Sequence, residues 1–248
     1  MNALRLRSYD LASRSGVVPL PSSVYLTVSN ALYPLKMRTG GSSDRKALHQ
    51  IFIEEEYEPL ALVQPAAILD LGANVGYSSA YFLSKYPTAR VVAVEPDPQN
   101  YALCCRNLSP FRGRATVING AVWPERTSLV LVRGGFRDGR EWATQVRPAA
   151  PAEGEVAQVE GYDVATLIGL AGASEIDLLK IDIEGSERAL FERDTEKWLP
   201  NIRNICVELH DEDSKAVFVR ALSRYSYECL LSGELTVCQN LRVSSIPS

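Results

Sequence analysis

Nine residues from Ile68 to Gly76, with the sequence ILDLGANVG, place a carboxylate and two glycines directly after a short apolar run. The apolar run predicts a buried strand, and Gly72 and Gly76 allow a backbone turn to approach a ligand closely because they lack side chains. The helix expected after the turn has free N–H groups and a positive dipole end, which suit a carboxylate or a phosphate. This pattern indicates a binding site for a nucleotide-like cofactor.

The spacing of the glycines narrows the kind of cofactor. Enzymes that bind a dinucleotide and transfer hydride carry G-x-G-x-x-G, whereas Gly72 and Gly76 are four residues apart, with no glycine two residues from either. Glu95 ends the next expected strand, where a carboxylate can accept both ribose hydroxyl hydrogens. Ala121 and Val122 follow the third strand, where an adenine ring would lie over small side chains. Read alone, each carboxylate is also typical of a turn, but their positions at the ends of consecutive strands favour a ligand.

A second set of polar residues ends two later apolar strands. Alternate residues of a strand share a face, so Lys180, Asp182 and Glu184 line up at one strand end. By the same rule Glu208 and His210 line up at the other. A lysine inside an apolar strand needs a partner, since an unpaired buried charge is very costly, and Glu208 or Asp182 would serve.

These residues suit three kinds of chemistry. As a catalyst, His210 would be a general base for a hydroxyl, because the ordinary histidine pKa lies near neutrality, with Glu208 or Asp182 orienting it or the acceptor. As structural groups, Lys180 and Glu208 would form an ion pair and His210 would cap the next helix. As a metal site, Asp182, Glu208 and His210 have the oxygen-rich composition that suits Mg²⁺ or Mn²⁺. We favour the catalytic role and expect no metal.

Short apolar strands alternate with helical segments along most of the chain. Such alternation predicts an α/β fold with a parallel sheet covered on both faces, and the last two strands are expected to form a hairpin around Ser232 and Gly233. The expected strands cover 67–71, 90–95, 115–119, 176–182, 203–209, 226–231 and 235–241. The expected helices cover 75–86, 98–107, 185–193 and 212–224.

The chain is expected to have two parts. Residues 1–58 form an N-terminal segment with a helix that docks on the core, and residues 59–248 form the cofactor-binding domain. Within the first part, the expected elements are a helix at 22–32, a strand at 33–38 and a helix at 44–57 capped by Ser43 or Asp44. The three glutamates at the end of the last of these helices are interpreted as solvated.

Residues 133–162 interrupt the alternation of strands and helices. They are rich in Gly, Arg, Pro, Ala and Glu and contain Trp142 and a strand-like run at 155–160. One interpretation is a surface excursion with an edge hairpin. The other is a cap over the substrate pocket, since long loops in compact domains are often functional.

Composition limits the classes of function. The 248 residues carry a formal net charge of −4, whereas a nucleic-acid binder usually has a basic excess, so we expect no nucleic-acid partner. Five cysteines without a CxxC spacing argue against a disulfide framework and a zinc site. The uncharged stretch from Ser15 to Leu35 contains three prolines and several polar residues, so no membrane span is expected. With no clean signal peptide either, these features predict a cytoplasmic protein.

Two motifs carry a resemblance to a known family. The pattern D-x-G-x-N-x-G from Asp70 to Gly76, followed by V-E-P-D, resembles class I S-adenosylmethionine-dependent methyltransferases. The block K-I-D-I-E-G-S-E from Lys180 to Glu187 is similar to the signature of the FkbM methyltransferase family, and the later V-E-L-H is similar to a strand end of that family. The resemblance covers roughly residues 33–241.

The resemblance implies a Rossmann-like class I methyltransferase, with a mostly parallel seven-stranded sheet, an antiparallel last strand and helices on both faces. The strands that end in Asp182 and Glu208 would then be neighbours, with their polar tips beside the cofactor. It implies S-adenosylmethionine as cofactor, with the turn holding the methionine part and the helix start donating to its carboxylate. The implied cofactor-binding residues are Asp70, Gly72, Asn74, Gly76, Tyr77, Ser78, Glu95, Asp97, Ala121 and Val122.

The resemblance also implies methyl transfer, usually to a hydroxyl of a sugar or a secondary metabolite, with Asp182, Glu208 and His210 on the acceptor side. The partner would be a small molecule or glycan with a free hydroxyl, and the uncharged N-terminal segment would pack on its own domain or on a second subunit of a homodimer. The alternatives are an N-methyltransferase, a metal-assisted O-methyltransferase, an NAD-dependent reductase and a non-catalytic interaction protein. The glycine spacing argues against the reductase, and the intact turn with Glu95 argues against the last.

Overall fold

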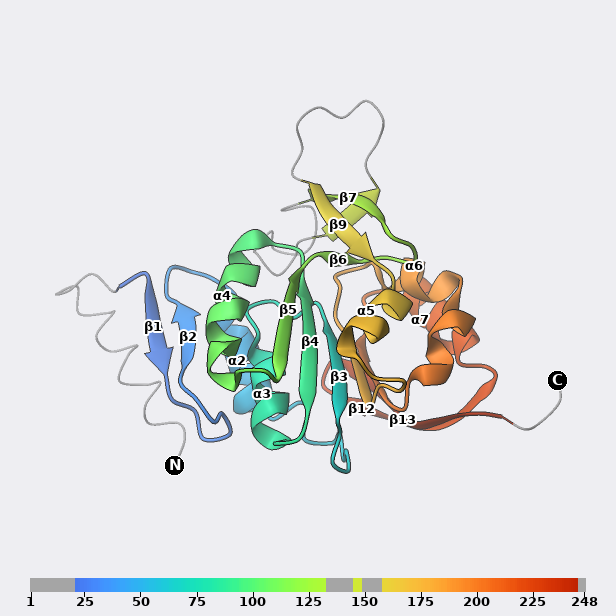
Figure 1. Ribbon diagram of the computed structural model, residues 1–248, viewed down its shortest axis with the longest axis horizontal. Helices are drawn as coiled ribbons and strands as arrows, with labels where there is room; N and C mark the ends of the chain where they lie inside the picture. The colour runs from blue at the N-terminus through green and yellow to red at the C-terminus, as the bar shows by residue number, and fades with distance from the viewer. Residues whose placement is uncertain (1–20, 133–144, 149–157, 245–248) are drawn as a thin grey trace.

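The computed structural model describes residues 21–132, 145–148 and 158–244, and these build an α/β fold of three layers (Figure 1). Within the described residues, the middle layer is a seven-stranded sheet with the strand order β12-β13-β11-β10-β3-β4-β5. Its strands are β3 (Ala67–Leu71), β4 (Arg90–Glu95), β5 (Ala115–Asn119), β10 (Leu178–Ile181), β11 (Ile205–Glu208), β12 (Tyr225–Ser232) and β13 (Leu235–Val243).

The central strands of this sheet are apolar and buried. Every residue of β3 (AILDL) and of β10 (LLKI) is buried, as expected for a parallel sheet covered on both faces. Strand β10 pairs in parallel with β3 and β11, whereas β13 runs antiparallel to both of its neighbours. The predicted sheet, its antiparallel last strand and the adjacency of the strands that end near Asp182 and Glu208 are confirmed.

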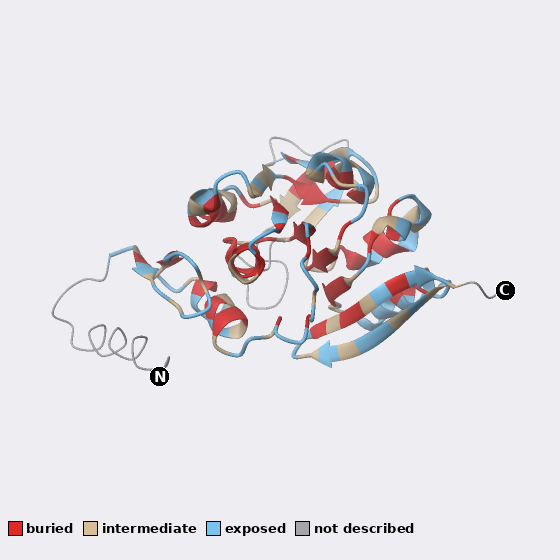
Figure 2. Cartoon of the chain, turned by 60° about the horizontal axis from the view of Figure 1, so that its bottom comes forward, coloured by how far each residue is buried: buried red, intermediate tan, exposed pale blue. Residues whose placement is uncertain are grey.

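Helices cover both faces of the sheet and enclose two hydrophobic cores. One face carries α2 (Asp44–Phe52), α3 (Tyr77–Lys85) and α4 (Pro98–Leu108), and the other carries α5 (Val164–Ala171), α6 (Glu187–Glu192) and α7 (Glu212–Ala221). Short 3-10 helices lie at Ser109–Phe111, Thr195–Lys197 and Leu199–Asn201. The buried residues concentrate along the strands and the inward sides of the helices (Figure 2). Of the helices in the described ranges, none combines the length and apolar character needed to span a bilayer.

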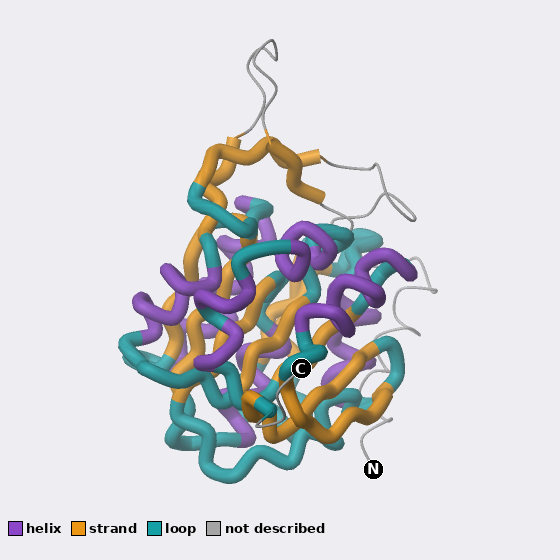
Figure 3. The backbone as a smooth tube through the Cα atoms, turned by 90° about the vertical axis from the view of Figure 1, so that its right-hand side faces the viewer, coloured by secondary structure: helices purple, strands orange, loops and turns teal. Residues whose placement is uncertain are grey.

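A second, smaller sheet stands at one end of the molecule (Figure 3). It contains β6 (Ala121–Val122), β7 (Thr127–Val132), β8 (Gln145–Pro148) and β9 (Gln158–Tyr162), in the order β6-β9-β7-β8. Of the predicted excursion at 133–162, only 145–148 and 158–162 are described, and both are strands of this sheet. Trp142 and the first part of the run at 155–160 lie outside the described residues.

The described part of the N-terminal segment packs on the main domain. β1 (Ser23–Leu26) and β2 (Leu35–Arg38) form an antiparallel pair, so the helix predicted at 22–32 is wrong. The sequence of β1 is Ser-Val-Tyr-Leu, whose β-branched and aromatic side chains favour a strand once a partner strand is present. Leu48 and Phe52 of α2 are buried in the core on the α3 side of the large sheet.

Helix α2 begins at Asp44 as predicted, but it ends earlier than predicted and lacks the expected side-chain cap. It ends at Phe52 rather than at residue 57, and Glu55 beyond it has a φ of 55°, which does not continue a helix. Ser43 occupies the cap position without a side-chain cap hydrogen bond. The Asp44 carboxylate instead binds the guanidinium of Arg38, with 2.6 Å between Nη2 and Oδ1.

Candidate active site

The C-terminal ends of β3, β4, β10 and β11 open into one cavity, which is continuous with solvent. Residues of α2, of the segment after it and of the turn before β13 line the opposite side. A cavity at the carboxyl ends of parallel strands is the usual ligand site of α/β sheets. This cavity is therefore the candidate active site.

The two glycines of the turn are required by contacts within the protein. Gly72 has a φ of 78°, and a Cβ there would lie 1.7 Å from the backbone oxygen of Asp182. Gly76 has a φ of 84°, and a Cβ there would lie 2.9 Å from Cys104 Sγ. Since Gly76 is left-handed, α3 begins at Tyr77 and not at residue 75 as predicted. The turn is thus pressed against β10 and α4 before any ligand is considered.

Asp70 lies behind the cavity wall and holds a buried charge cluster together. Its Oδ2 accepts hydrogen bonds of 2.6 Å from the hydroxyls of Ser78 and Ser79. Its Oδ1 lies 3.2 Å from Lys180 Nζ, and that amine also donates to the carbonyl of Gly72 at 2.7 Å.

The expected partner of Lys180 therefore needs correction. The predicted partners were Glu208 and Asp182, but Asp182 lies farther away, at 3.9 Å, and Asp70 is the close partner. Burial alone would lower the pKa of Lys180, and the charges of Asp70 and Asp182 reverse this and raise the pKa above its ordinary value. Lys180 thus carries its charge inside the sheet because the first strand supplies a carboxylate.

Glu95, at the end of β4, lines the cavity and has both oxygens held by backbone N–H groups. Oε2 accepts from Asn74 N and Oε1 from Asp97 N, both at 2.9 Å. Burial raises the pKa of Glu95 to about 7, and these hydrogen bonds only partly oppose it. Asp97 is the N-cap of α4, with Oδ1 accepting from Gln99 N at 2.8 Å, so its side chain anchors that helix.

The side-chain donors expected at the start of α3 already have protein partners. The Tyr77 hydroxyl donates to the carbonyl of Lys36 at 3.0 Å, and the Ser78 hydroxyl is the one that donates to Asp70. The backbone N–H groups of this first helical turn have no acceptor within the helix, as at any helix start. Ala121 and Val122 are buried in β6 and line the cavity.

Most of the expected cofactor-binding residues reach the cavity. Those that line it are Gly72, Asn74, Tyr77, Ser78, Glu95, Ala121 and Val122. The described cavity lining does not include Asp70, Gly76 or Asp97. These three residues support the lining residues through the contacts given above. The Oδ1 atom of Asn74 is buried and has no hydrogen-bond partner among the described residues, so it remains available to a ligand.

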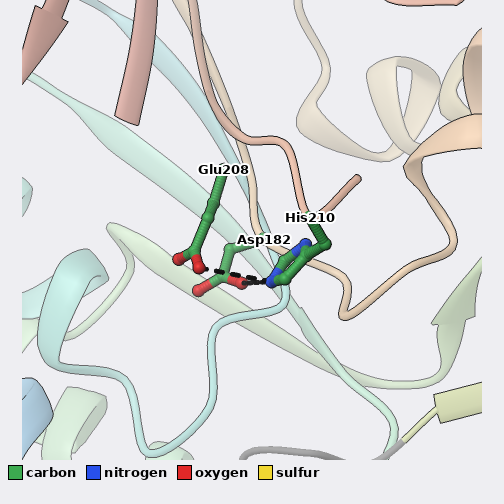
Figure 4. Close-up of side chains that lie close together, drawn as sticks. All are labelled: Asp182, Glu208 and His210. Atoms are coloured by element: carbon green, nitrogen blue, oxygen red, sulfur yellow. Dashed lines mark ion pairs between the residues drawn. The ribbon is translucent and has the colours of Figure 1, made fainter. Parts of the chain in front are cut away.

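The acceptor-side residues meet at the ends of β10 and β11 (Figure 4). The His210 side chain is 1% exposed, and its Nδ1 lies 3.1 Å from Glu187 Oε1. Its Nε2 lies 3.3 Å from Glu208 Oε1 and 3.9 Å from Asp182 Oδ1, with Glu184 Oε2 at 3.4 Å. Asp182 and Glu208 line the cavity, and His210 lies behind them.

These surroundings change the acid–base character of His210. Burial alone would lower its pKa, but hydrogen bonds to Glu187 and Glu208 and the surrounding negative charges raise it to about 11. The imidazole therefore keeps both protons at neutral pH, and the near-neutral pKa assumed for a general base does not hold.

Two further features of this group bear on the expected roles. The alternative role of His210 as a helix cap is wrong, since Asp211 caps α7 through a 2.6 Å hydrogen bond from Ser214 N. Burial raises the pKa of Asp182 to about 6, and the opposing charge of Lys180 moderates the shift.

Glu56 lines the cavity although its sequence context indicated a solvated helix end. Burial raises its pKa to about 7. The hydroxyl of Ser232 donates to the carbonyl of Glu56 at 2.8 Å, which ties this segment to the β12–β13 turn, where Glu234 also lines the cavity. Nothing in the local acidic run signals this position, because it arises from contacts between distant segments.

The sheet order, the glycine turn after the first strand and the carboxylate at the end of the second define a class I methyltransferase. The chain belongs to the FkbM family of these enzymes, because the domain described as "Methyltransferase FkbM domain" matches residues 70–229. The matched domain is therefore a methyltransferase domain, and S-adenosylmethionine is its cofactor.

Similar proteins differ in how much of their length this chain spans. AMB antimetabolite synthetase AmbE of Pseudomonas aeruginosa is 27% identical over 234 residues, covering 72% of this chain and 10% of that protein. The 31-O-demethyl-FK506 methyltransferase FkbM of Streptomyces tacrolimicus is 27% identical over 184 residues, covering 63% of this chain and 70% of that protein. The crystal structure of methyltransferase FkbM from Methylobacillus flagellatus KT has a TM-score of 0.46 at 16% identity, covering 72% of this chain and 44% of that one.

Proposed function

We propose that this protein transfers a methyl group from S-adenosylmethionine to a hydroxyl of a small molecule or glycan, as in sugar or secondary-metabolite chemistry. The observation that carries this proposal is that two sets of groups line one cavity on either side of β3. Glu95 and Ala121 lie on one side, and Asp182 and Glu208 on the other. The cofactor supplies a methyl that an oxygen attacks in line, so the protein must position that oxygen and accept its proton.

The cofactor side fits an adenosylated amino acid. Glu95 Oε1 accepts from Asp97 N and from the side-chain amide of Asn100, whereas Oε2 accepts only from Asn74 N among the described residues and keeps a further lone pair for a ribose hydroxyl. Asn74 Oδ1 would accept from the cofactor ammonium, and the N–H groups at the start of α3 would bind its carboxylate. Ala121 and Val122 supply the small apolar wall that an adenine ring needs.

The acceptor side uses carboxylates. Asp182 and Glu208 present oxygens to the cavity that would hold the acceptor hydroxyl and accept its proton. His210 serves as a positioning residue, because its imidazolium holds Glu208 through Nε2 while Glu187 fixes Nδ1. This keeps His210 in the acceptor machinery and moves the role of base to a carboxylate.

The name of the Streptomyces tacrolimicus relative gives 31-O-demethyl-FK506 as its substrate, which supports a hydroxyl acceptor here. An amine acceptor is the second candidate, because the described lining carries more carboxylates than lysines. The carboxylates are Glu56, Glu95, Asp182, Glu184, Glu208 and Glu234, and the lysines are Lys46 and Lys180.

Calorimetry with S-adenosylmethionine, S-adenosylhomocysteine and NAD tests the cofactor side. We expect micromolar binding of the first two and no binding of NAD; a chain that binds neither adenosyl ligand is not this enzyme. Incubation of hydroxylated and aminated metabolites with ¹³C-methyl-labelled cofactor then tests the acceptor. A product methyl resonance in the O-methyl region supports the proposal, and one in the N-methyl region replaces it with the second candidate.

A further inference from the structure

The orientation of His210 is fixed from behind by a carboxylate that cannot turn away. Glu187 is fully buried, and its two oxygens accept backbone N–H groups from Ile183 at 3.1 Å and Gly185 at 2.9 Å. A carboxylate held in this way is an acceptor, so His210 Nδ1 must be the donor in their 3.1 Å contact. This leaves Nε2 as the atom that faces the cavity side, and carboxylates orient metal-binding histidines in the same manner.

The atoms around Nε2 have the spacing of ligands around one cation. One ligand atom each from Asp182, Glu208 and His210 can be chosen so that all lie within 4.8 Å of one another. Octahedral Mg²⁺ with bonds of 2.0–2.1 Å has adjacent ligands about 3 Å apart and opposite ligands about 4.2 Å apart. The distances from Nε2 to Glu208 (3.3 Å) and to Asp182 (3.9 Å) fall within that range.

A second observation concerns charge and an unused acceptor atom. Asp182 Oδ1 is buried and has no hydrogen-bond partner among the described residues. Figure 4 shows the Asp182 and Glu208 carboxylates directed toward the same edge of the imidazole. Lys180 is held mainly by Asp70 and the carbonyl of Gly72 and reaches Asp182 only at 3.9 Å, so it neutralises this corner of the cavity only in part. Several carboxylates confined together need positive charge, since uncompensated buried charge is costly.

We propose that Asp182, Glu208 and His210 bind one divalent cation of the Mg²⁺ or Mn²⁺ class at the acceptor side of the cavity. Oxygen-rich ligand sets with one imidazole suit these ions. Binding replaces the proton on His210 Nε2, which is released to solvent. The cation then leaves coordination positions for water and for the hydroxyl oxygen of the acceptor, and a bound hydroxyl is acidified by the ion.

The role of the acceptor in this site rests on the proposed function, whereas cation binding itself does not. With Asp182 and Glu208 serving as ligands, Glu56 becomes the cavity carboxylate that would accept the proton of the hydroxyl. Cation binding is therefore tested without any acceptor, by adding Mn²⁺ alone to the full chain saturated with S-adenosylhomocysteine.

The test follows the paramagnetic resonance signal of free Mn²⁺ during this titration at pH 7.5. We expect one Mn²⁺ per chain, displaced by excess Mg²⁺, and about tenfold or more weaker binding in Asp182→Asn and in Glu208→Gln. The matched control is Glu192→Gln, an exposed carboxylate on α6, which should bind Mn²⁺ like the parent chain. Circular dichroism and S-adenosylhomocysteine affinity report whether each variant is folded.

The outcomes separate the two proposals. No Mn²⁺ bound at millimolar concentration, or equal binding by folded Asp182→Asn and the parent chain, overturns the cation site and leaves cofactor binding untouched. If the parent chain does not bind S-adenosylhomocysteine, the proposed function is overturned instead. The cation site is supported if the parent chain and Glu192→Gln each bind one Mn²⁺ and both ligand variants bind it much more weakly.

Discussion

The cofactor side and the acceptor side of the cavity differ in how their charges are balanced. On the cofactor side, the carboxylate of Asp70 is matched by two hydroxyls and an amine, and that of Glu95 by two backbone N–H groups. On the acceptor side, His210 lies among four carboxylates. On one side the protein itself supplies partners for both carboxylates, and the other gathers negative charge around a single imidazole.

This difference indicates how each side recognises its ligand. Paired groups on rigid elements hold their geometry before binding, which suits a cofactor that every reaction cycle shares. Where carboxylates outnumber the neighbouring positive groups, a ligand that brings positive charge or hydrogen-bond donors stabilises them most. Variants that unbalance the first side should therefore damage the fold, whereas variants on the second should alter ligand binding.

The largest effect is expected from Lys180→Met, which leaves Asp70 buried without its cation. Removing one partner of a buried ion pair typically costs about 3–5 kcal/mol in the free energy of unfolding. Urea denaturation monitored by circular dichroism measures this loss. The control is Lys85→Met, which breaks the surface pair with Glu58 and should cost far less. Similar losses in the two variants would contradict the structural role of the Asp70–Lys180 pair.

A smaller effect is expected from Gly72→Ala, measured against Gly113→Ala. Both glycines have positive φ, 78° and 73°, so both variants carry the cost of a left-handed alanine, about 1–2 kcal/mol. Only at Gly72 does the new Cβ meet another group, the backbone oxygen of Asp182 at 1.7 Å, whereas Gly113 has open space. We expect about 1–3 kcal/mol of additional destabilisation and weaker S-adenosylhomocysteine binding at Gly72 alone. Thermal unfolding and calorimetry on both variants check this, and equal effects would mean that the turn can move away from β10.

The central strands β3, β4, β10 and β11 could be predicted from the sequence because each is a mainly apolar run, and such runs depend little on distant residues. The smaller sheet was harder to predict, since β6 has only two residues and β8 lies in a segment of mixed composition. Helix α5 did have a local signal that the prediction missed. Asp163 caps it, and its buried residues Val164, Leu167 and Ile168 have helical spacing.

The candidate site shows a similar division. The motifs predicted which strand ends carry polar groups, but not which of those groups meet. Lys180 is 110 positions from Asp70 along the chain, and their pairing appears only when β10 lies beside β3. The expected pKa of His210 failed for the same reason, because Glu187 reaches it from another element. The position of Glu56 was not predicted because distant segments bury it, and the acidic run in the sequence gives no sign of that burial.

The smallest effect, and the most direct test of the paired side, is the pH dependence of cofactor binding. Burial raises the pKa of Glu95 to about 7, and ribose hydroxyls donate best to the ionised carboxylate. Protonation as the pH falls through 7 should therefore weaken binding, and S-adenosylhomocysteine affinity should rise roughly tenfold from pH 6 to pH 8 and level off above that.

Calorimetry across this range checks the pH prediction, with Glu95→Gln as the matched variant. That variant cannot ionise, so its affinity should be lower and flat with pH. Because the folded pKa lies above the ordinary glutamate value, the free protein binds a proton here that the cofactor must expel, which links cofactor binding to proton release. An affinity that does not change between pH 6 and pH 8 in the parent chain would remove Glu95 from ribose recognition and leave it as a support for the turn at Asn74.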